Sequence, residues 1–371
     1  MQKEVTIYDI ANELGYSIAT VSRALKNDPS VRPDTKKKIQ TLAQKRGYQS
    51  NYFASSLRKS KTHTIGVIMH ELNSHFMVSV LAGIEKVLST TVYDIIIAHS
   101  AESAKKEIAN VNNLFHKRVD GILAALSYDT EDLSHFDPYV KKNIPVVFFD
   151  RVDEKDNKRI NVTIDNFKAG FEATNHLIEQ GCKRIAHITG HLTRNVYSQR
   201  FEGYKAALKA NKIAYKENLL FVNDLQKETC VQVARSIAKM KPMPDGIFIT
   251  NDISAAIMMQ TFKELNIRIP EDIAIVGFNN DIVSTLVEPK LTTINYPGTT
   301  MGEIAAKTLL NCLQEKNTRN IKFYISTVIT SDLIVRDSSV RKKEKQKTNQ
   351  INLPTANYNH EQHCFTKTIG T

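Results

Sequence analysis

Apolar residues spaced three and four apart in the first fifty residues predict three short helices. The apolar face of the first helix consists of Ile7, Ile10, Ala11 and Leu14. Thr6 followed by Asp9 indicates a capping box at its start, and Gly15 is a typical helix-ending residue. Ser17 can cap a second helix, and Pro33 suits the first turn of a third. The chain is therefore expected to begin with a compact three-helix unit.

From residue 65 onward, short β-rich runs alternate with amphipathic segments. The expected strands are TIGVIM, YDIII, DGILAAL and PVVFFD, then INVTID, RIAHIT, DGIFIT and DIAIVGF. The expected helices span 76–89, 102–116, 166–180, 198–210, 228–239 and 252–265. Such alternation predicts parallel sheets covered by helices on both faces. Because the segment is about 270 residues long, two doubly wound sheets fit it better than one.

These patterns divide the chain into four parts. They are a three-helix domain at 1–50, a small, polar and basic linker at 51–62, the alternating body at 63–337, and a tail without periodicity, expected to be disordered, at 338–371. Later strands, LTTIN and IKFYISTVI, would let the chain cross back between the two halves of the body. We expect one lobe at about 63–161 plus 292–322 and the other at about 162–290 plus 323–337.

The positive charge lies at the two ends of the chain. Of the net charge of +11, residues 1–62 carry 12 Lys/Arg against 5 Asp/Glu, and residues 338–371 carry 6 against 2. The stretch between them has 32 of each. This distribution predicts a small module that contacts phosphates, attached to a neutral body with another task.

The sequence contains no recognisable targeting signal and no closely spaced pair of cysteines. The first 30 residues have acids and no continuous apolar run, and no 18-residue apolar segment occurs. The four cysteines, Cys182, Cys230, Cys312 and Cys364, are widely scattered, which fits a reducing compartment. We therefore expect a soluble, cytoplasmic protein with no membrane partner.

The start of the second predicted helix has the short side chains that a helix needs in order to approach base edges in the DNA major groove. It reads Ser17, Ile18, Ala19, Thr20, with Ser22 and Arg23 one turn on. Hydroxyls can bond phosphates or bases, whereas Ile18 and Ala19 can contact only apolar surface such as thymine methyl groups. A three-helix bundle can also dock onto a protein, but the basic charge of this segment favours DNA.

The segment TIYDIANELGYSIATVSRALKNDPSVRPDTKKKIQTLAQKRGY resembles the DNA-binding domain of the LacI/GalR family of bacterial transcriptional regulators. The resemblance continues through NYFASSLR, FFDR, VTIDNFKAGFEATNHLIEQGCKRIAHITG, RFEGYKAAL, ITNDISAAIMMQTFKELNIRIPEDIAIVGFNND and PKLTTINYP, reaching about residue 337. It implies a helix-turn-helix domain and a hinge, followed by a two-lobed α/β domain like type I periplasmic binding proteins.

The resemblance also implies a function: a repressor that binds near-palindromic operator DNA and is therefore nucleoid-associated. Two helix-turn-helix domains reading two half-sites need a two-fold axis, so a homodimer is expected, and pairing of dimers into tetramers stays open. The implied major-groove and phosphate contacts are Thr6, Tyr8, Ser17, Ile18, Ala19, Thr20, Ser22 and Arg23.

The linker is implied to become a hinge helix on the operator, with Leu57 as a wedge in the minor groove. A leucine among polar linker residues has no core to join, and apolar wedges unstack base steps. The implied minor-groove residues are Asn51, Ala54, Ser55, Leu57 and Arg58. Alternatively, Leu57 packs on the body.

Two open sheets that face each other leave a cleft at the carboxyl ends of their strands. In the family this cleft binds a small effector, expected here to be a sugar or sugar derivative, which controls operator affinity allosterically. The implied effector-binding residues are Asn73, Phe76, Asp150, Arg151, Arg200, Asn251, Asp252 and Asn279. Two of them have other readings: Asp252 as a helix cap, and Arg200 as the partner of a nearby acid such as Glu202.

Two departures from the family pattern leave the effector's identity open. Asn279 stands where many relatives have an acid, and the loop HELNSHF replaces a commoner NPFF pattern. Some relatives respond to a phosphorylated partner protein instead of a free sugar, and the sequence does not decide between the two.

Catalytic motifs of the types GxSxG, GxxxxGK and HExxH do not occur, so we expect no enzyme activity, no cofactor and no metal. His360, His363 and Cys364 in the tail could bind a metal fortuitously. The alternative function is a sugar-binding protein without gene regulation, which the basic module and the lack of a signal peptide disfavour.

Overall fold

The computed structural model describes residues 5–48, 61–153, 159–315 and 326–341 of the 371-residue chain. The N-terminal domain consists of α1 (Ile7–Leu14), α2 (Ile18–Leu25) and α3 (Pro33–Lys45). The expected caps are confirmed: Thr6 and Asp9 form the capping box, Gly15 ends α1 with φ 68°, and the Ser17 hydroxyl accepts from the backbone N–H of Thr20. The domain is held by a small core of Ile10, Val21, Ala24 and Ile39, all fully buried.

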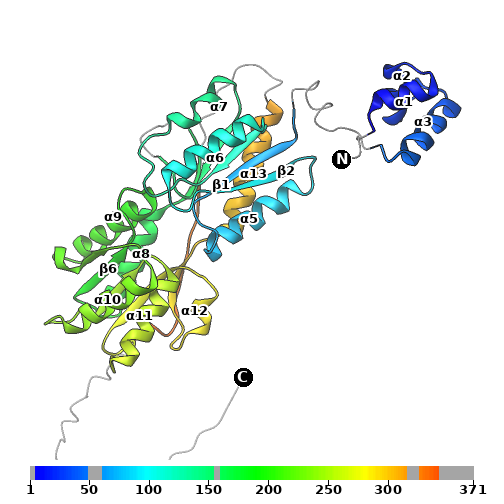
Figure 1. The fold of residues 1–371 in the computed structure, drawn as a ribbon. Helices are drawn as coiled ribbons and strands as arrows, with labels where there is room; N and C mark the ends of the chain where they lie inside the picture. The colour runs from blue at the N-terminus through cyan, green and yellow to red at the C-terminus, as the bar shows by residue number, and fades with distance from the viewer. Residues whose placement is uncertain (1–4, 49–60, 154–158, 316–325, 342–371) are drawn as a thin grey trace, which may run out of the picture.

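The described part of the body forms two six-stranded sheets (Figure 1). The first has the order β11-β5-β4-β3-β1-β2, with all strands parallel. Its strands are β1 (Thr64–Met69), β2 (Asp94–His99), β3 (Gly121–Ala124), β4 (Val146–Phe149), β5 (Ile160–Ile164) and β11 (Ser326–Ile329). The second has the order β12-β10-β9-β8-β6-β7, and β12 alone is antiparallel. Its strands are β6 (Ile185–Thr189), β7 (Leu220–Val222), β8 (Gly246–Ile249), β9 (Ala274–Asn279), β10 (Thr292–Asn295) and β12 (Leu333–Ile334).

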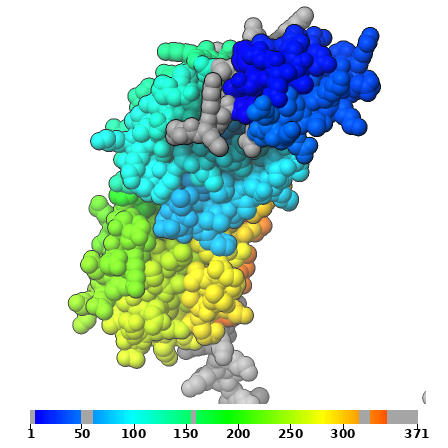
Figure 2. Space-filling view, turned by 45° about the vertical axis from the view of Figure 1, so that its right-hand side comes forward, coloured from blue at the N-terminus to red at the C-terminus, as the bar shows by residue number. Residues whose placement is uncertain are grey.

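Helices cover both faces of each sheet, which explains why strands such as β3 and β8 are apolar throughout and fully buried. The first lobe carries α5 (His75–Leu88), α6 (Ala104–His116), the 3₁₀ turn η1 (Ser134–Phe136), α7 (Asp137–Lys141) and α13 (Gly298–Glu315). The second carries α8 (Asn166–Glu179), α9 (Asn195–Ala210), η2 (Glu217–Leu219), α10 (Lys227–Lys239), α11 (Asp252–Glu264) and α12 (Val283–Leu286). Figure 2 shows the two lobes stacked end to end.

Along its described segments, the chain crosses between the lobes three times, and the expected division was wrong at two of these crossings. Residues 292–322 are expected in the first lobe, but β10 pairs with β9 in the second sheet. Of the described part of this range, it is α13, packed along α5, that belongs to the first lobe. We assigned 323–337 to the second lobe, but β11 pairs with β5 in the first sheet. Short apolar runs show that a strand forms, but not which sheet edge receives it.

The expected disorder from residue 338 was also wrong for 338–341. Ser338 and Ser339 are fully buried in the second lobe. The backbone carbonyl of Ser338 accepts from Ile275 N at 2.8 Å, and its hydroxyl accepts from Thr292 N at 2.9 Å. Polar residues that satisfy buried backbone groups leave no apolar pattern, so this packing could not be predicted from the sequence. Within the described residues, no helix has the length and apolar character that crossing a membrane requires.

Candidate functional site

The start of α2 presents a small, mostly apolar face to solvent. Ser17, Ile18, Ala19 and Arg23 are exposed, and Ile18 retains 42% of its accessible surface. The hydroxyl groups of Ser17 and Thr20 lie 2.9 Å apart, and that of Ser17 caps the helix. Arg23 Nε donates to the carbonyl of Ala19 at 3.4 Å. Because several polar groups here bond within one turn, Ile18 and Ala19 form the apolar centre of the face.

Other predicted DNA contacts border this face or lie outside the described residues. Tyr8 is 61% exposed, Thr6 is exposed with its hydroxyl bonded to Asp9, and Ser22 is half-buried. The hinge candidates Asn51, Ala54, Ser55, Leu57 and Arg58 fall within 49–60, outside the described residues.

In the body, charged side chains gather where strands of the two sheets end. Asp150 follows β4, and its carboxylate Oδ1 accepts from the hydroxyl of Tyr296, which follows β10, at 2.5 Å. Its other oxygen lies 3.3 Å from Nε2 of His70, at the end of β1. Asp150 is 4% exposed. This carboxylate therefore joins the two lobes inside the protein.

The charges around Asp150 keep it ionised. Burial alone would raise the pKa of Asp150, but the hydrogen bond and charge of His70 and the charge of Arg151 lower it overall. The pKa of His70 is raised: burial and Arg151 act against its charge, but Asp150 and Glu102 outweigh them. Burial and the nearby Asp150 raise the pKa of Tyr296. Tyr296 is thus held as a neutral hydrogen-bond donor.

Arg151 forms a second link between the lobes. Its Nη1 donates to both carboxylate oxygens of Glu102, at 2.8 and 2.7 Å, and its Nη2 donates to the hydroxyl of Tyr197 on α9 at 3.2 Å. Against the effect of burial, His70 and Arg151 lower the pKa of Glu102 to about 2. The amide of Asn195 adds two bonds across the same junction, to the backbone of Asp150 and Val152.

Arg200 lies on α9 and is 3% exposed. Its Nε donates to Asn166 Oδ1 at 2.9 Å, and its guanidinium sits 3.5 Å from the ring centroid of Phe278. The alternative in which Arg200 pairs with Glu202 was wrong, since Glu202 pairs with Lys205. Burial lowers the pKa of Arg200. Its position depends on Gly170 of α8, where an added Cβ would lie 2.3 Å from the Arg200 carbonyl oxygen.

Asn251 and Asp252 are occupied by structural bonds. Asn251, not Asp252, caps α11, and its side chain accepts from the N–H of Ser254. Asp252 accepts from the Thr293 hydroxyl at 2.7 Å and from the Asp281 N–H at 2.8 Å. Burial raises the pKa of Asp252 to about 7. The reading of Asp252 as the helix cap was therefore wrong, because the cap is its neighbour Asn251.

A pocket of about 200 Å³ opens between α5 of the first lobe and the loops after β9 and β10 of the second. Its walls include the candidates Phe76 and Asn279, and Phe76 stacks on Tyr296 with ring centroids 4.0 Å apart. His75 and Asp281 face each other across it at 3.4 Å. Asn73 lies exposed on the loop before α5.

Three residues of the cleft have positive φ angles, a backbone conformation that residues other than glycine rarely adopt. The φ angles are 56° at Glu102, 60° at Asp150 and 117° at Asn279. Such strain costs of order 1–3 kcal/mol per residue and is concentrated at ligand sites.

The sequence prediction missed His70, Glu102, Tyr197 and Tyr296. Three of these follow a predicted strand at its carboxyl end, in TIGVIM-His70, in the run after YDIII, and in LTTIN-Tyr296. Their position after a strand was the signal that could have identified them, because neighbouring parallel strands end at the same edge of the sheet. Together with the predicted Asp150, Arg151 and Arg200, they place fixed donors, acceptors and an aromatic pair at one junction, an arrangement that can recognise adjacent hydroxyls and an apolar ring face.

Comparisons with known proteins match both parts of the chain. A family model described as bacterial regulatory proteins, lacI family, matches residues 6–51, and one described as a periplasmic binding protein-like domain matches residues 174–339. Catabolite control protein A of Priestia megaterium is 31% identical over 313 residues, covering 84% of this chain and 93% of that protein.

Two solved structures agree in fold. The transcriptional regulator CelR in complex with cellobiose has a TM-score of 0.67 and 26% identity, covering 90% of this chain and 100% of that one. The lac repressor dimer bound to operator and the anti-inducer ONPF has a TM-score of 0.78 over 91% of this chain and 100% of that one. At 22% identity, this second likeness concerns the fold alone.

Proposed function

This chain belongs to the LacI family of bacterial regulatory proteins, and from this membership we propose that it represses transcription with an operator affinity set by a carbohydrate in the cleft. The observation that carries the proposal is the set of buried charges at the junction of the lobes. Asp150, Arg151 and Arg200 are each no more than 6% exposed, and they come from both lobes. Burying charge is costly, so charges at an interlobe junction are typical of a ligand site.

The chemistry of this junction suits a polyol. Carboxylate and guanidinium groups can accept from and donate to adjacent hydroxyls, while Phe76 and Tyr296 offer ring faces to C–H bonds. The cellobiose complex of CelR supports a sugar as the first class to test. Asn73, Phe76 and Asn279 are proposed as contacts at the rim; Asn251 and Asp252 would act by shaping the loops around them.

The proposed coupling runs through the three crossings. A ligand that bonds Asp150 and Arg200 more strongly in one lobe arrangement shifts the population towards it, and only such a difference can change operator affinity. The operator would be read by a homodimer in the cytoplasm, through the exposed face of α2 and through the hinge residues 51–59, with Leu57 as wedge.

A ligand screen by thermal unfolding tests the effector. Cellobiose, other mono- and oligosaccharides, sugar phosphates and nucleobases are added to the full chain, and a true effector at 100 times its Kd adds about 2.7 kcal/mol of stability. Arg200→Ala should lose this response. Arg268→Ala, which removes an exposed arginine paired with Asp272 in the same lobe, should keep it. A sugar response that survives Arg200→Ala would refute the site.

A further inference from the structure

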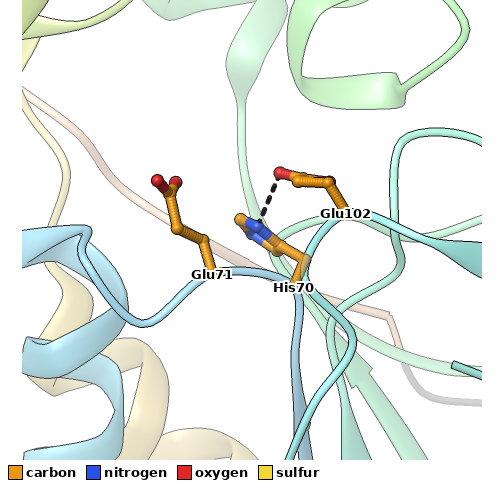
Figure 3. Close-up of side chains that lie close together, drawn as sticks. All are labelled: His70, Glu71 and Glu102. Atoms are coloured by element: carbon orange, nitrogen blue, oxygen red, sulfur yellow. Dashed lines mark ion pairs between the residues drawn. The ribbon is translucent and has the colours of Figure 1, made fainter. Parts of the chain in front are cut away.

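Three potential metal ligands converge at the edge of the first lobe that faces the cleft. The donor atoms of His70, Glu71 and Glu102 all lie within 4.8 Å of one another. Figure 3 shows the three side chains rising from two neighbouring loops towards one space. The loops follow β1 and β2, which are adjacent parallel strands, and are joined by a backbone bond from Glu102 N to the carbonyl of His70 at 3.0 Å. No metal site was expected from the sequence.

The imidazole of His70 is oriented as metal-binding histidines are. It is 4% exposed, and its Nε2 faces Asp150 Oδ2 at 3.3 Å. Its other nitrogen, Nδ1, therefore points to Glu102, whose Oε1 lies 3.0 Å away. A carboxylate behind the distal ring nitrogen fixes the tautomer and strengthens the ligand nitrogen in many metal sites. Asp150 has this position relative to Nδ1.

The two glutamates complete a mixed nitrogen and oxygen donor set. Arg151 and the N–H of Tyr128 hold the Glu102 carboxylate in place. Glu71 is half-buried and brings a further negative charge to the same space. Donors of a tetrahedral zinc ion lie about 3.4 Å apart at the usual bond lengths. The 3.0 Å between His70 and Glu102 needs to grow by only a few tenths of an ångström, and Glu71 needs a side-chain rotation.

We propose that His70 Nδ1, Glu71 and Glu102 bind a divalent transition-metal ion of the zinc class. Imidazole with carboxylates suits such ions, whereas Mg²⁺ and Ca²⁺ prefer oxygen ligands only. The ion takes the position between His70 Nδ1 and Glu102 Oε1. Three protein ligands leave a fourth position for water or a ligand hydroxyl from the cleft. The site thus binds a cation in addition to the sugar proposed above.

Calorimetric titration of the full chain with zinc chloride, without DNA or sugar, tests the site. Wild type should bind one ion per chain, and Glu71→Gln should weaken binding at least 10-fold. Glu71→Gln suits the test because Glu71 is half-buried and its substitution leaves the His70–Asp150 contact intact. Thermal unfolding of the variant verifies that it folds. Glu85→Gln, an exposed residue of α5, is the matched control and should bind as wild type does.

A second control addresses the tail, where His363→Ala with Cys364→Ser removes potential ligands and should leave binding unchanged. Zinc binding that persists in Glu71→Gln, disappears with the tail variant, or is absent from wild type overturns the proposal. Equal affinity for magnesium or calcium chloride overturns the assigned ion class. Operator and sugar binding are measured separately, so failure here leaves the regulatory function standing.

Discussion

The N-terminal domain and the cleft differ in how their polar groups are held. On the face of α2, Ser17 bonds Thr20 and Arg23 bonds Ala19, three and four positions apart. In the cleft, the bond between His70 and Asp150 spans 80 positions, and that between Tyr296 and Asp150 spans 146. Local bonds form wherever the helix forms, whereas the cleft exists only when the whole body is folded. Mutations in the two regions should therefore have separable effects.

The largest effect is expected for Asp150→Ala. The change removes the acceptor of both His70 and Tyr296 and leaves buried positive charge without its partner. We expect a loss of about 3–5 kcal/mol in the free energy of unfolding of the body. Urea unfolding followed by circular dichroism measures it, with the exposed Asp332→Ala as control. A loss equal to that of the control would show that Asp150 does not join the lobes.

Ile10→Ala should affect the N-terminal domain and not the body. Ile10 is fully buried in a core of few residues, and truncation costs about 3 kcal/mol. A domain of this size has little stability to lose, so operator binding should disappear. The thermal transition of the body should stay where it is. A fall in both transitions would mean that the domain and the body unfold as one unit.

Gly170→Ala tests whether the cleft depends on packing behind it. An added Cβ meets the Arg200 carbonyl oxygen at 2.3 Å, so α8 and α9 must separate. The expected cost is about 3 kcal/mol, at the upper end for overpacking because backbone cannot give way cheaply. Sugar binding should weaken although the change is made outside the cleft. Lys168→Ala, exposed on the same helix, is the control; equal sugar affinity in both variants would contradict the prediction.

His187→Phe should change the response to acid. Burial lowers the pKa of His187 to about 3, below the value of about 6.5 in unfolded chains. Its contribution to stability is therefore complete above pH 6.5 and is lost as the pH falls, by about 2 kcal/mol at pH 5. Urea unfolding at pH 7 and 5 should show a smaller drop in the variant. Residues 1–62 contain no histidine, so an unchanged drop would place the acid response on other groups of the body.

The same contrast explains what could be predicted from the sequence. Thr6, Asp9, Gly15 and Ser17 act within a few residues, so their roles are visible in the chain itself. The alternation of strands and helices predicted two parallel sheets for the same reason. Sheet membership of β10 and β11 was missed because pairing depends on distant edges.

The cleft was predicted only in part. Asp150, Arg151 and Arg200 were found through the family resemblance, and the structure buries all three at the junction of the lobes. His70 and Glu102 were missed because their meaning comes from neighbouring strand ends, which are brought together by the order of strands in the sheet. Asp252 was misread, since its partners lie on other elements, Thr293 in β10 and Asp281 on the loop after β9.

The dependence of DNA binding on the cleft is tested most directly by fluorescence anisotropy of an operator duplex, selected by the full chain from a randomised pool. Wild type should change its affinity at least about fivefold when the sugar that stabilises it is added. Arg200→Ala should show no such change, and Arg268→Ala should respond as wild type does. An affinity that ignores the sugar in wild type, or that responds equally in Arg200→Ala, would contradict control of the operator by the cleft.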